Sequence, residues 1–187
     1  MKMQIDETKV LKLTIRAENQ DTINVFLEDF SPGHGQITIT SYGNSWVHYW
    51  PGMGNRKIHE FFCDCDAPYI IGKLLDYRKH DEFDNERTLK QIKRDLIGKR
   101  FEGYFSKEHA REMWDDIVNN LDGCSEKEMF LSFLTGGGTS ELYDGDWYDC
   151  LQKRRTSDYN HLQNVIIPTV KAALVETFAI KKKSIDA

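Results

Sequence analysis

A histidine and two cysteines lie close together near the middle of the chain and could bind a metal ion. In "IHEFFCDC", a helix would place His59 and Cys63 on one face, and Cys65 follows shortly after. Zinc takes imidazole and thiolate ligands, usually from Cys-x2-Cys or His-x3-His pairs, and Cys124 or Cys150 could complete such a set. The Cys63-x-Cys65 spacing is tighter than the common pair and no second close pair exists. Packing of Cys63 as a small apolar side chain is therefore the favoured interpretation.

Two other segments carry residue types that could do chemistry. "YDGDWYDC" offers Asp144, Asp146 and Asp149 to a hard cation, but the further oxygen ligands and the closing glutamate of a calcium loop are missing. "TGGGTS" follows a predicted helix, whereas a phosphate-binding loop precedes one and ends in Lys-Ser/Thr. No Gly-x-Ser-x-Gly elbow is present. The sequence therefore predicts no cofactor and no catalytic residue, although it leaves open whether the protein is an enzyme.

An aromatic segment, "SWVHYWPGMG", raises the question of a binding surface. Alternate residues of a strand share a face, which groups Trp46, His48 and Trp50 on one side and Val47 and Tyr49 on the other. Two indoles bury more apolar area than a valine and a tyrosine, so we expect Trp46 and Trp50 to pack inward beneath helices. Tyr49 and Met53 are then expected at the surface, where a partner could contact them.

The elements that would position these residues follow from the spacing of apolar residues. Period-two alternation predicts strands at residues 10–16, 22–30, 36–42 and 45–50, separated by turn formers such as "SPGHG". Spacings of three and four predict helices at 56–65, 67–77, 89–98, 106–121, 125–134 and 157–180. We expect Asp66 and Ser106 to be N-caps, Gly98 to end the third helix, and Pro168 to kink or split the last one.

These elements predict an α+β fold. An antiparallel β-meander of three or four strands in residues 1–55 would pack against about five to six α-helices in residues 56–187. The charged run 77–88 is expected to be an exposed connection, and residues 136–150 an irregular acidic segment. At 187 residues, the chain is expected to form a single domain, 1–187.

Composition narrows the classes of partner. The chain has 30 acidic against 25 basic residues and a formal net charge of -5, so binding of nucleic acid would need a local basic patch such as Lys153-Arg154-Arg155. No apolar run approaches the ~18 residues that span a bilayer, and no secretory leader is evident. We therefore expect a soluble cytoplasmic protein with reduced cysteines and no membrane partner.

One part of the chain resembles a known group of proteins. "VFLEDFSPGHGQITITSYGNSWVHYWPGMG" followed by "IHEFFCDCDAPYIIGKL" is similar to small accessory proteins encoded by phages and prophages of Gram-negative bacteria. The likeness covers roughly residues 23–75, with a weaker match in "YNHLQNVIIPTVKAAL", and residues 106–150 lie outside it. The resemblance implies an accessory protein acting in the cytoplasm of the infected host. It supplies no catalytic residues.

The leading functional hypothesis is binding to a host or phage protein, including inhibition of a host defence complex that handles nucleic acid. Acidic side chains could occupy a basic groove of such a partner, because complementary charge steers association. The residues expected to contact the partner are Asp115, Asp116, Asp144, Asp146, Asp149, Tyr49 and Met53. The alternatives are a metal-binding enzyme that uses His59, Cys63 and Cys65, and a nucleic-acid-binding module. Neither the oligomeric state nor the partner's identity follows from the sequence.

Overall fold

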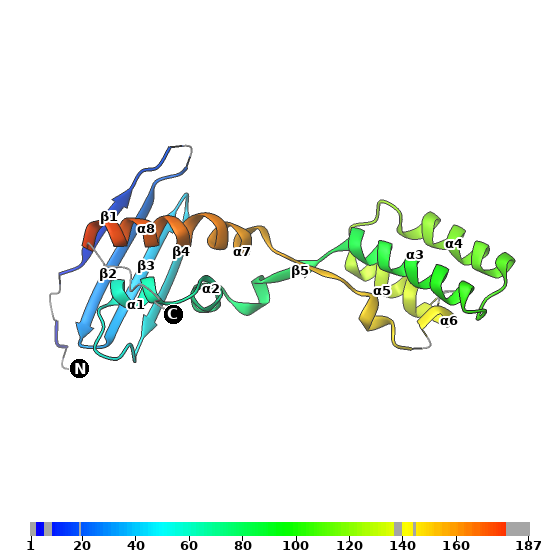
Figure 1. The fold of residues 1–187 in the computed structure, drawn as a ribbon, viewed down its shortest axis with the longest axis horizontal. Coiled ribbons are helices and arrows are strands. Elements are labelled where there is room, and N and C mark those ends of the chain that lie inside the picture. Colours follow the sequence, from blue (N-terminus) through cyan, green and yellow to red (C-terminus); the bar gives the residue numbers. More distant parts are fainter. Residues whose placement is uncertain (1–2, 6–8, 19, 137–139, 144, 179–187) are drawn as a thin grey trace, which may run out of the picture. The chain divides into compact units, whose positions relative to one another are not determined.

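The chain folds into two compact units, each with its own hydrophobic core (Figure 1). A computed structural model describes residues 3–5, 9–18, 20–136, 140–143 and 145–178. Unit 1 comprises residues 1–80 together with 156–187, and unit 2 comprises residues 81–155. Unit 2 is inserted between two parts of unit 1, and the expectation of a single domain stays a prediction. The expected α+β class is confirmed.

Unit 1 is built on a four-stranded antiparallel sheet. Its strands are β1 (Leu11–Ile15), β2 (Ile23–Ser31), β3 (His34–Ser41) and β4 (Asn44–Trp50), paired in the order β1-β2-β3-β4. The register aligns Leu13 with Val25 and Val25 with Ile39, so the apolar positions of neighbouring strands fall on one face. The predicted meander is confirmed, and each predicted strand differs from the observed one by a few residues at most.

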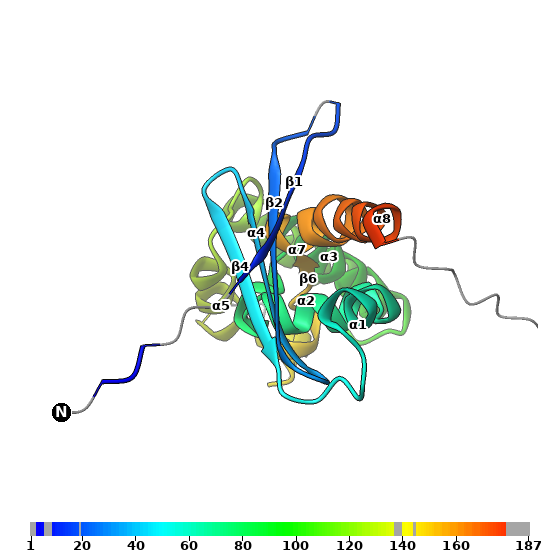
Figure 2. The same ribbon diagram turned by 90° about the vertical axis from the view of Figure 1, so that its left-hand side faces the viewer.

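In the described part of the chain, helices cover only one face of this sheet (Figure 2). They are α1 (Ile58–Asp64), α2 (Ala67–Leu74), α7 (Ser157–His161) and α8 (Ile167–Phe178), with a short 3-10 helix η1 (Tyr77–Lys79) after α2. Trp46 and Trp50 lie in the core beneath them at 7% and 3% exposure, as the alternation of β4 predicted. The indole of Trp50 donates a hydrogen bond to the Tyr69 hydroxyl at 3.2 Å, which satisfies its N–H group.

The helix starts follow from local capping chemistry. The Asp66 carboxylate accepts the Tyr69 amide at 2.7 Å at the start of α2, as predicted. Asp29, at the end of β2, accepts the Ile58 amide at 2.8 Å and so ties the sheet to the first turn of α1. Pro168 does not break the last helix. A π-helical turn, η3 (Leu162–Ile166), precedes it and carries the chain from α7 into α8, so the missing proline N–H is accommodated by a changed hydrogen-bond pattern.

Two glycine-containing loops pack against each other at one end of the sheet. The Met53 amide donates to the Gly33 carbonyl at 2.7 Å, and a Cβ at Gly33 would lie 1.8 Å from the Gly54 carbonyl oxygen. Met53 itself is 0% exposed. The expectation that Met53 lies at the surface is therefore wrong: its side chain fills the space beneath this loop pair, and it cannot meet a partner without unfolding the contact.

Unit 2 is a helical unit closed by a short two-stranded ladder. It contains β5 (Asp81–Phe83), α3 (Asn85–Phe101), α4 (Lys107–Leu121), α5 (Lys127–Gly136), α6 (Ser140–Tyr143), the 3-10 helix η2 (Trp147–Cys150) and β6 (Lys153–Arg155). Its core includes Ile92 and Leu96 of α3, Met113 and Ile117 of α4, and Phe130 of α5. Ser106 caps α4 by accepting the His109 amide at 3.1 Å, as predicted.

Two predictions for this part of the chain are wrong. The charged run 77–88 is not a plain connection, because it forms η1, pairs as β5 and begins α3, with Asp84 as the N-cap. Gly98 does not end α3. The helix continues to Phe101 and stops at Gly103, which has φ +85°, while the Tyr104 amide bonds back to the Lys99 carbonyl at 3.0 Å. These backbone hydrogen bonds satisfy the last carbonyl oxygens of α3. Gly98 lies inside the helix and does not have this role.

Candidate functional site

The face of the unit 1 sheet that carries no helix presents a contiguous set of side chains. One row across the four strands contains Lys12, Phe26, Thr38 and Val47, and the next contains Glu28, Gln36 and Tyr49. These residues alternate with the buried positions of the same strands, so the pleat alone directs them outward. We call this surface the open sheet face.

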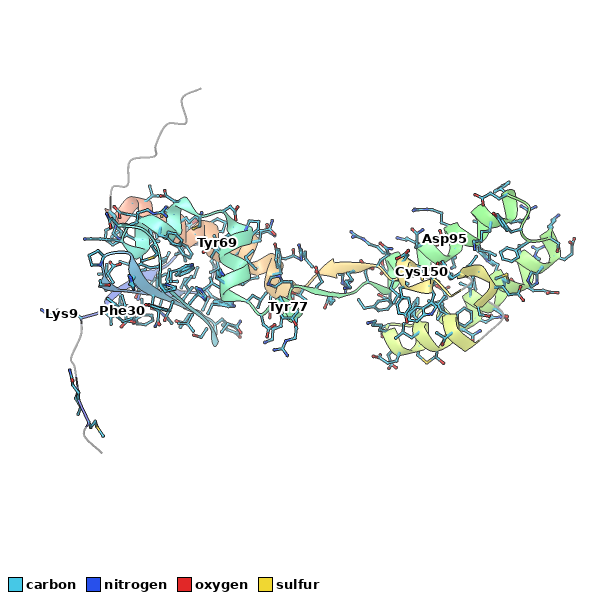
Figure 3. The ribbon with its side chains drawn as sticks, turned by 90° about the horizontal axis from the view of Figure 1, so that it is seen from below. Lys9, Phe30, Tyr69, Tyr77, Asp95 and Cys150 are labelled. Carbon is cyan, nitrogen blue, oxygen red and sulfur yellow. The ribbon has the colours of Figure 1, made fainter. Side chains whose placement is uncertain are left out.

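Aromatic and aliphatic side chains remain exposed on the open sheet face. Phe30, Val47 and Tyr49 are 55%, 53% and 43% exposed. The rings of Phe30, which is labelled in Figure 3, and Tyr49 pack edge to face with centroids 5.7 Å apart. The Tyr49 hydroxyl lies 3.3 Å from Nδ1 of His34, which fixes the orientation of its ring. The cluster is thus held in place before any partner arrives.

The open sheet face carries little net charge. The Lys12 ammonium lies 5.4 Å from the centroid of the Phe26 ring, and Gln36 donates to the Glu28 carboxylate at 3.3 Å. One cation and one carboxylate among the residues of the two rows leave the surface nearly neutral. Such a surface favours contact with uncharged groups over contact with phosphate.

The structure gives His59, Cys63 and Cys65 other partners than a shared ion. His59 stacks on Phe178 with ring centroids 3.9 Å apart, and the Lys171 ammonium donates to the carbonyl oxygens of both cysteines. Burial lowers the pKa of His59 and raises the pKa of both thiols, so each group is held in its neutral form. Across the described ranges, no three His, Cys, Asp or Glu side chains are grouped to hold an ion.

A buried polar network in unit 2 also holds its thiol protonated. Figure 3 labels Asp95 and Cys150, which belong to this network. The Tyr143 hydroxyl donates to Asp95 at 2.8 Å, and the Gln91 amide donates to the other Asp95 oxygen at 2.7 Å. Burial, the main cause, raises the pKa of Cys150 to about 11 and holds that of Tyr143 above its usual range. This shift is opposite to the one that activates a thiolate nucleophile.

The acidic residues expected to contact a partner stand on two elements. Asp115 and Asp116 are exposed on α4, and Asp146 and Asp149 are exposed immediately before and within η2. Asp144 lies outside the described residues. Their role in partner binding stays a prediction.

Two of the three cations of the predicted basic patch, Arg154 and Arg155, are paired with acids. Arg154 of β6 bonds Glu82 of β5 at 2.8 Å, and Arg155 bonds Asp81 at 2.8 Å. These ion pairs link the two strands of the ladder, so phosphate would compete with Glu82 and Asp81 for the two arginines.

Sequence reasoning found Tyr49 but missed Phe30 and Val47 as surface residues of interest. A signal was present for Phe30, whereas Val47 was placed on the outward face with Tyr49 but not named as a contact. In "INVFLEDF", the residues opposite the buried Ile23, Val25 and Leu27 include two phenylalanines where a solvated face would carry polar residues.

The protein has an α+β fold. Its helical unit is inserted into the chain after a four-stranded sheet, and the described helices of unit 1 cover one face of that sheet. The chain belongs to a family of phage proteins: the family model Phage_phiTE_072, described as a phage family, matches residues 3–176. This confirms a phage-encoded protein, and the match includes residues 106–150, which the earlier resemblance did not. No curated protein and no solved structure matches the chain. Every helix in the described part of the chain is too short or too polar to cross a bilayer.

Proposed function

We propose that this phage protein acts by binding another protein through the open sheet face. The observation that carries the proposal is the exposure of Phe30, Val47 and Tyr49 as neighbours on a surface that no described helix covers. Exposed apolar side chains gathered on one face are a common mark of an interaction site. The aromatic pair is already fixed by ring packing and by His34, which lowers the entropy cost of binding.

The chemistry of the face favours a protein partner with an uncharged apolar patch. Interface centres are rich in aromatic residues, and the two rows described above contain Phe26 and Tyr49 while the charges of Lys12 and Glu28 cancel. Binding of a nucleic-acid strand draws on several cations, and Lys12 is the one cation in these rows. A single-stranded nucleic acid stacked on Phe30 and Tyr49 is the competing outcome, which nuclease treatment distinguishes.

The test is affinity purification of the tagged full-length protein from phage-infected host cells. We expect the wild-type chain to retain a partner in stoichiometric amount, and Val47→Glu to retain at least about tenfold less, because a carboxylate would be buried without a counter-ion. Tyr77→Glu is the matched control, since Tyr77 is 78% exposed in unit 1 but lies outside the sheet. Both variants should keep the circular dichroism spectrum of the wild type.

Three results would each reject this function. The wild-type chain could be recovered alone, Val47→Glu could retain the partner unchanged, or both variants could lose it equally. Retention that nuclease abolishes would instead support the nucleic-acid outcome.

We further propose that the protein is an accessory factor in the cytoplasm of a Gram-negative host, and that its partner belongs to a host defence complex. Membership of the phage family supports this context. The exposed acids Asp115, Asp116, Asp146 and Asp149 are proposed as a second contact set, tested by their joint replacement with asparagine. Deletion of the gene should leave phage yield unchanged in a host without the defence system and reduce it where the system is present. Equal yields in both hosts would refute defence inhibition.

A further inference from the structure

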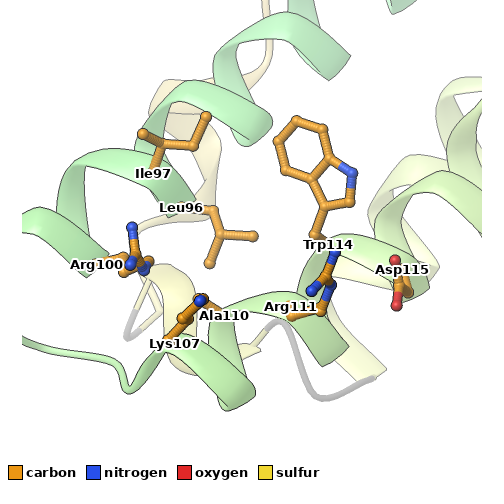
Figure 4. A pocket seen from close by; sticks show the side chains of 8 residues that line it. All are labelled: Leu96, Ile97, Arg100, Lys107, Ala110, Arg111, Trp114 and Asp115. Atoms are coloured by element: carbon orange, nitrogen blue, oxygen red, sulfur yellow. The ribbon is translucent and has the colours of Figure 1, made fainter.

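A pocket opens between α3 and α4 in unit 2 (Figure 4). Its volume is about 430 Å³, within the range of sites that hold a ligand or an anchoring side chain. The apolar lining comes from Leu96 and Ile97 of α3 and from Ala110 and Trp114 of α4. Ile97 remains 44% exposed, so apolar surface is open to solvent here.

The rim of the pocket is basic. Arg100, Lys107 and Arg111 line it, together with the single acid Asp115. The Lys93 ammonium lies 5.3 Å from the centroid of the Trp114 ring and adds a fourth cation. Within the described residues, none of these four cations forms an ion pair, whereas Arg154 and Arg155 of the same unit are paired with Glu82 and Asp81. Residues 81–155 contain more acids than bases, so this positive charge is local.

A second pocket continues along the same two helices. It has a volume of about 550 Å³ and is lined by Leu89 and Leu121, among others. Its charged lining is balanced, with Lys90 and Lys93 against Glu86 and Asp122, so the excess of positive charge lies at the first pocket. From Lys90 to Arg100, α3 rises roughly 15 Å, the length of about three helical turns. We call the two pockets together the α3–α4 groove.

We infer that the α3–α4 groove binds an acidic amphipathic helix of a partner protein. Apolar side chains spaced at i, i+3 or i+4, and i+7 would enter the two pockets, and flanking carboxylates would meet Arg100, Lys107 and Arg111. A nucleic-acid strand would pair its phosphates with the cations and stack a base on Trp114, but the aliphatic lining of Leu96, Ile97 and Ala110 offers its bases no stacking partner. The groove belongs to unit 2, so this site is separate from the open sheet face and goes beyond the function proposed for it.

The test is selection of a random peptide library on the immobilised full-length protein. We expect enriched peptides to combine Asp or Glu with apolar residues at helical spacing and to change the emission of Trp114. Reversing two rim charges together, Arg100→Glu with Arg111→Glu, should weaken the enriched peptides at least about tenfold. Arg94→Glu is the matched control, because Arg94 is exposed on the same helix but lines neither pocket.

Several outcomes would overturn the inference. They are the absence of enrichment, enrichment of peptides without acids, and equal loss of binding with Arg94→Glu. A 20-nucleotide single strand serves as the second probe. The inference fails if this strand binds the wild type, if the double variant no longer binds the strand, and if no acidic peptide is enriched. The groove would then be a nucleic-acid site. Val47→Glu should leave peptide binding unchanged, which separates this site from the open sheet face.

Discussion

Replacing Gly33 by alanine tests whether the packing of the two glycine loops holds unit 1 together. Gly33 and Gly43 both have φ +79°, so alanine meets the same backbone strain of about 1–2 kcal/mol at either position. Their surroundings differ. A Cβ at Gly33 would overlap the Gly54 carbonyl at 1.8 Å, whereas a Cβ at Gly43 would have nothing within 4 Å.

The overlap would force the two loops apart. The loss of stability depends on the contacts that this separation breaks. Separation breaks the bond from the Met53 amide to the Gly33 carbonyl, worth about 1 kcal/mol. It also shifts the fully buried Met53 side chain, whose complete loss of packing would cost about 2–5 kcal/mol. We therefore expect Gly33→Ala to lower the free energy of unfolding by at least about 2 kcal/mol more than Gly43→Ala.

Urea unfolding followed by tryptophan fluorescence measures this difference. Trp114 and Trp147 lie in unit 2, so replacing both with phenylalanine leaves Trp46 and Trp50 to report on unit 1 alone. Both glycine variants are made in that background. Equal losses of stability, within about 0.5 kcal/mol, would refute the role assigned to the loop contact.

Three further predictions follow from burial and from the chain path. Phe62→Ala should lower the free energy of unfolding by about 3–5 kcal/mol, because the ring is 0% exposed. Replacement of the exposed Tyr77 by alanine should change it by less than about 0.5 kcal/mol. Similar effects of the two substitutions in urea unfolding would contradict this prediction. At pH 8 the Cys150 thiol lies far below its pKa of about 11, so iodoacetamide labelling followed by mass spectrometry should be slow in the native protein, rise with pH, and become fast in urea. Equally fast labelling in the native state would show that the thiol is not buried as described. Residues 81–155 expressed alone should give a helical circular dichroism spectrum and a cooperative thermal transition, and a gradual melt would show that this segment needs the rest of the chain.

The sequence predicted most of unit 1 because its signals are local. Strict alternation in β2 and β3 determines which face is buried, and the two tryptophans of β4 decide the inward face there. Asp66 and Ser106 were recognised as caps because a capping side chain acts on an amide three residues away.

The errors arose where distant residues decide the structure. Asp81 and Glu82 look like a solvated charge run until Arg154 and Arg155, far along the chain, pair with them. Met53 looks exposed after Pro51 and Gly52, and only the approach of the Gly33 loop encloses it. The α3–α4 groove depends on how two helices pack, and no sequence motif predicts that packing.

The chain leaves and re-enters unit 1 at neighbouring positions. The Thr156 amide bonds the His80 carbonyl at 3.1 Å, and the Thr156 hydroxyl bonds the Lys79 carbonyl at 2.6 Å. A gene segment coding for residues 81–155 could therefore be exchanged by recombination while the ends it leaves remain joined by these bonds. Such a layout would keep the sheet of unit 1 intact while a different unit occupied the inserted position.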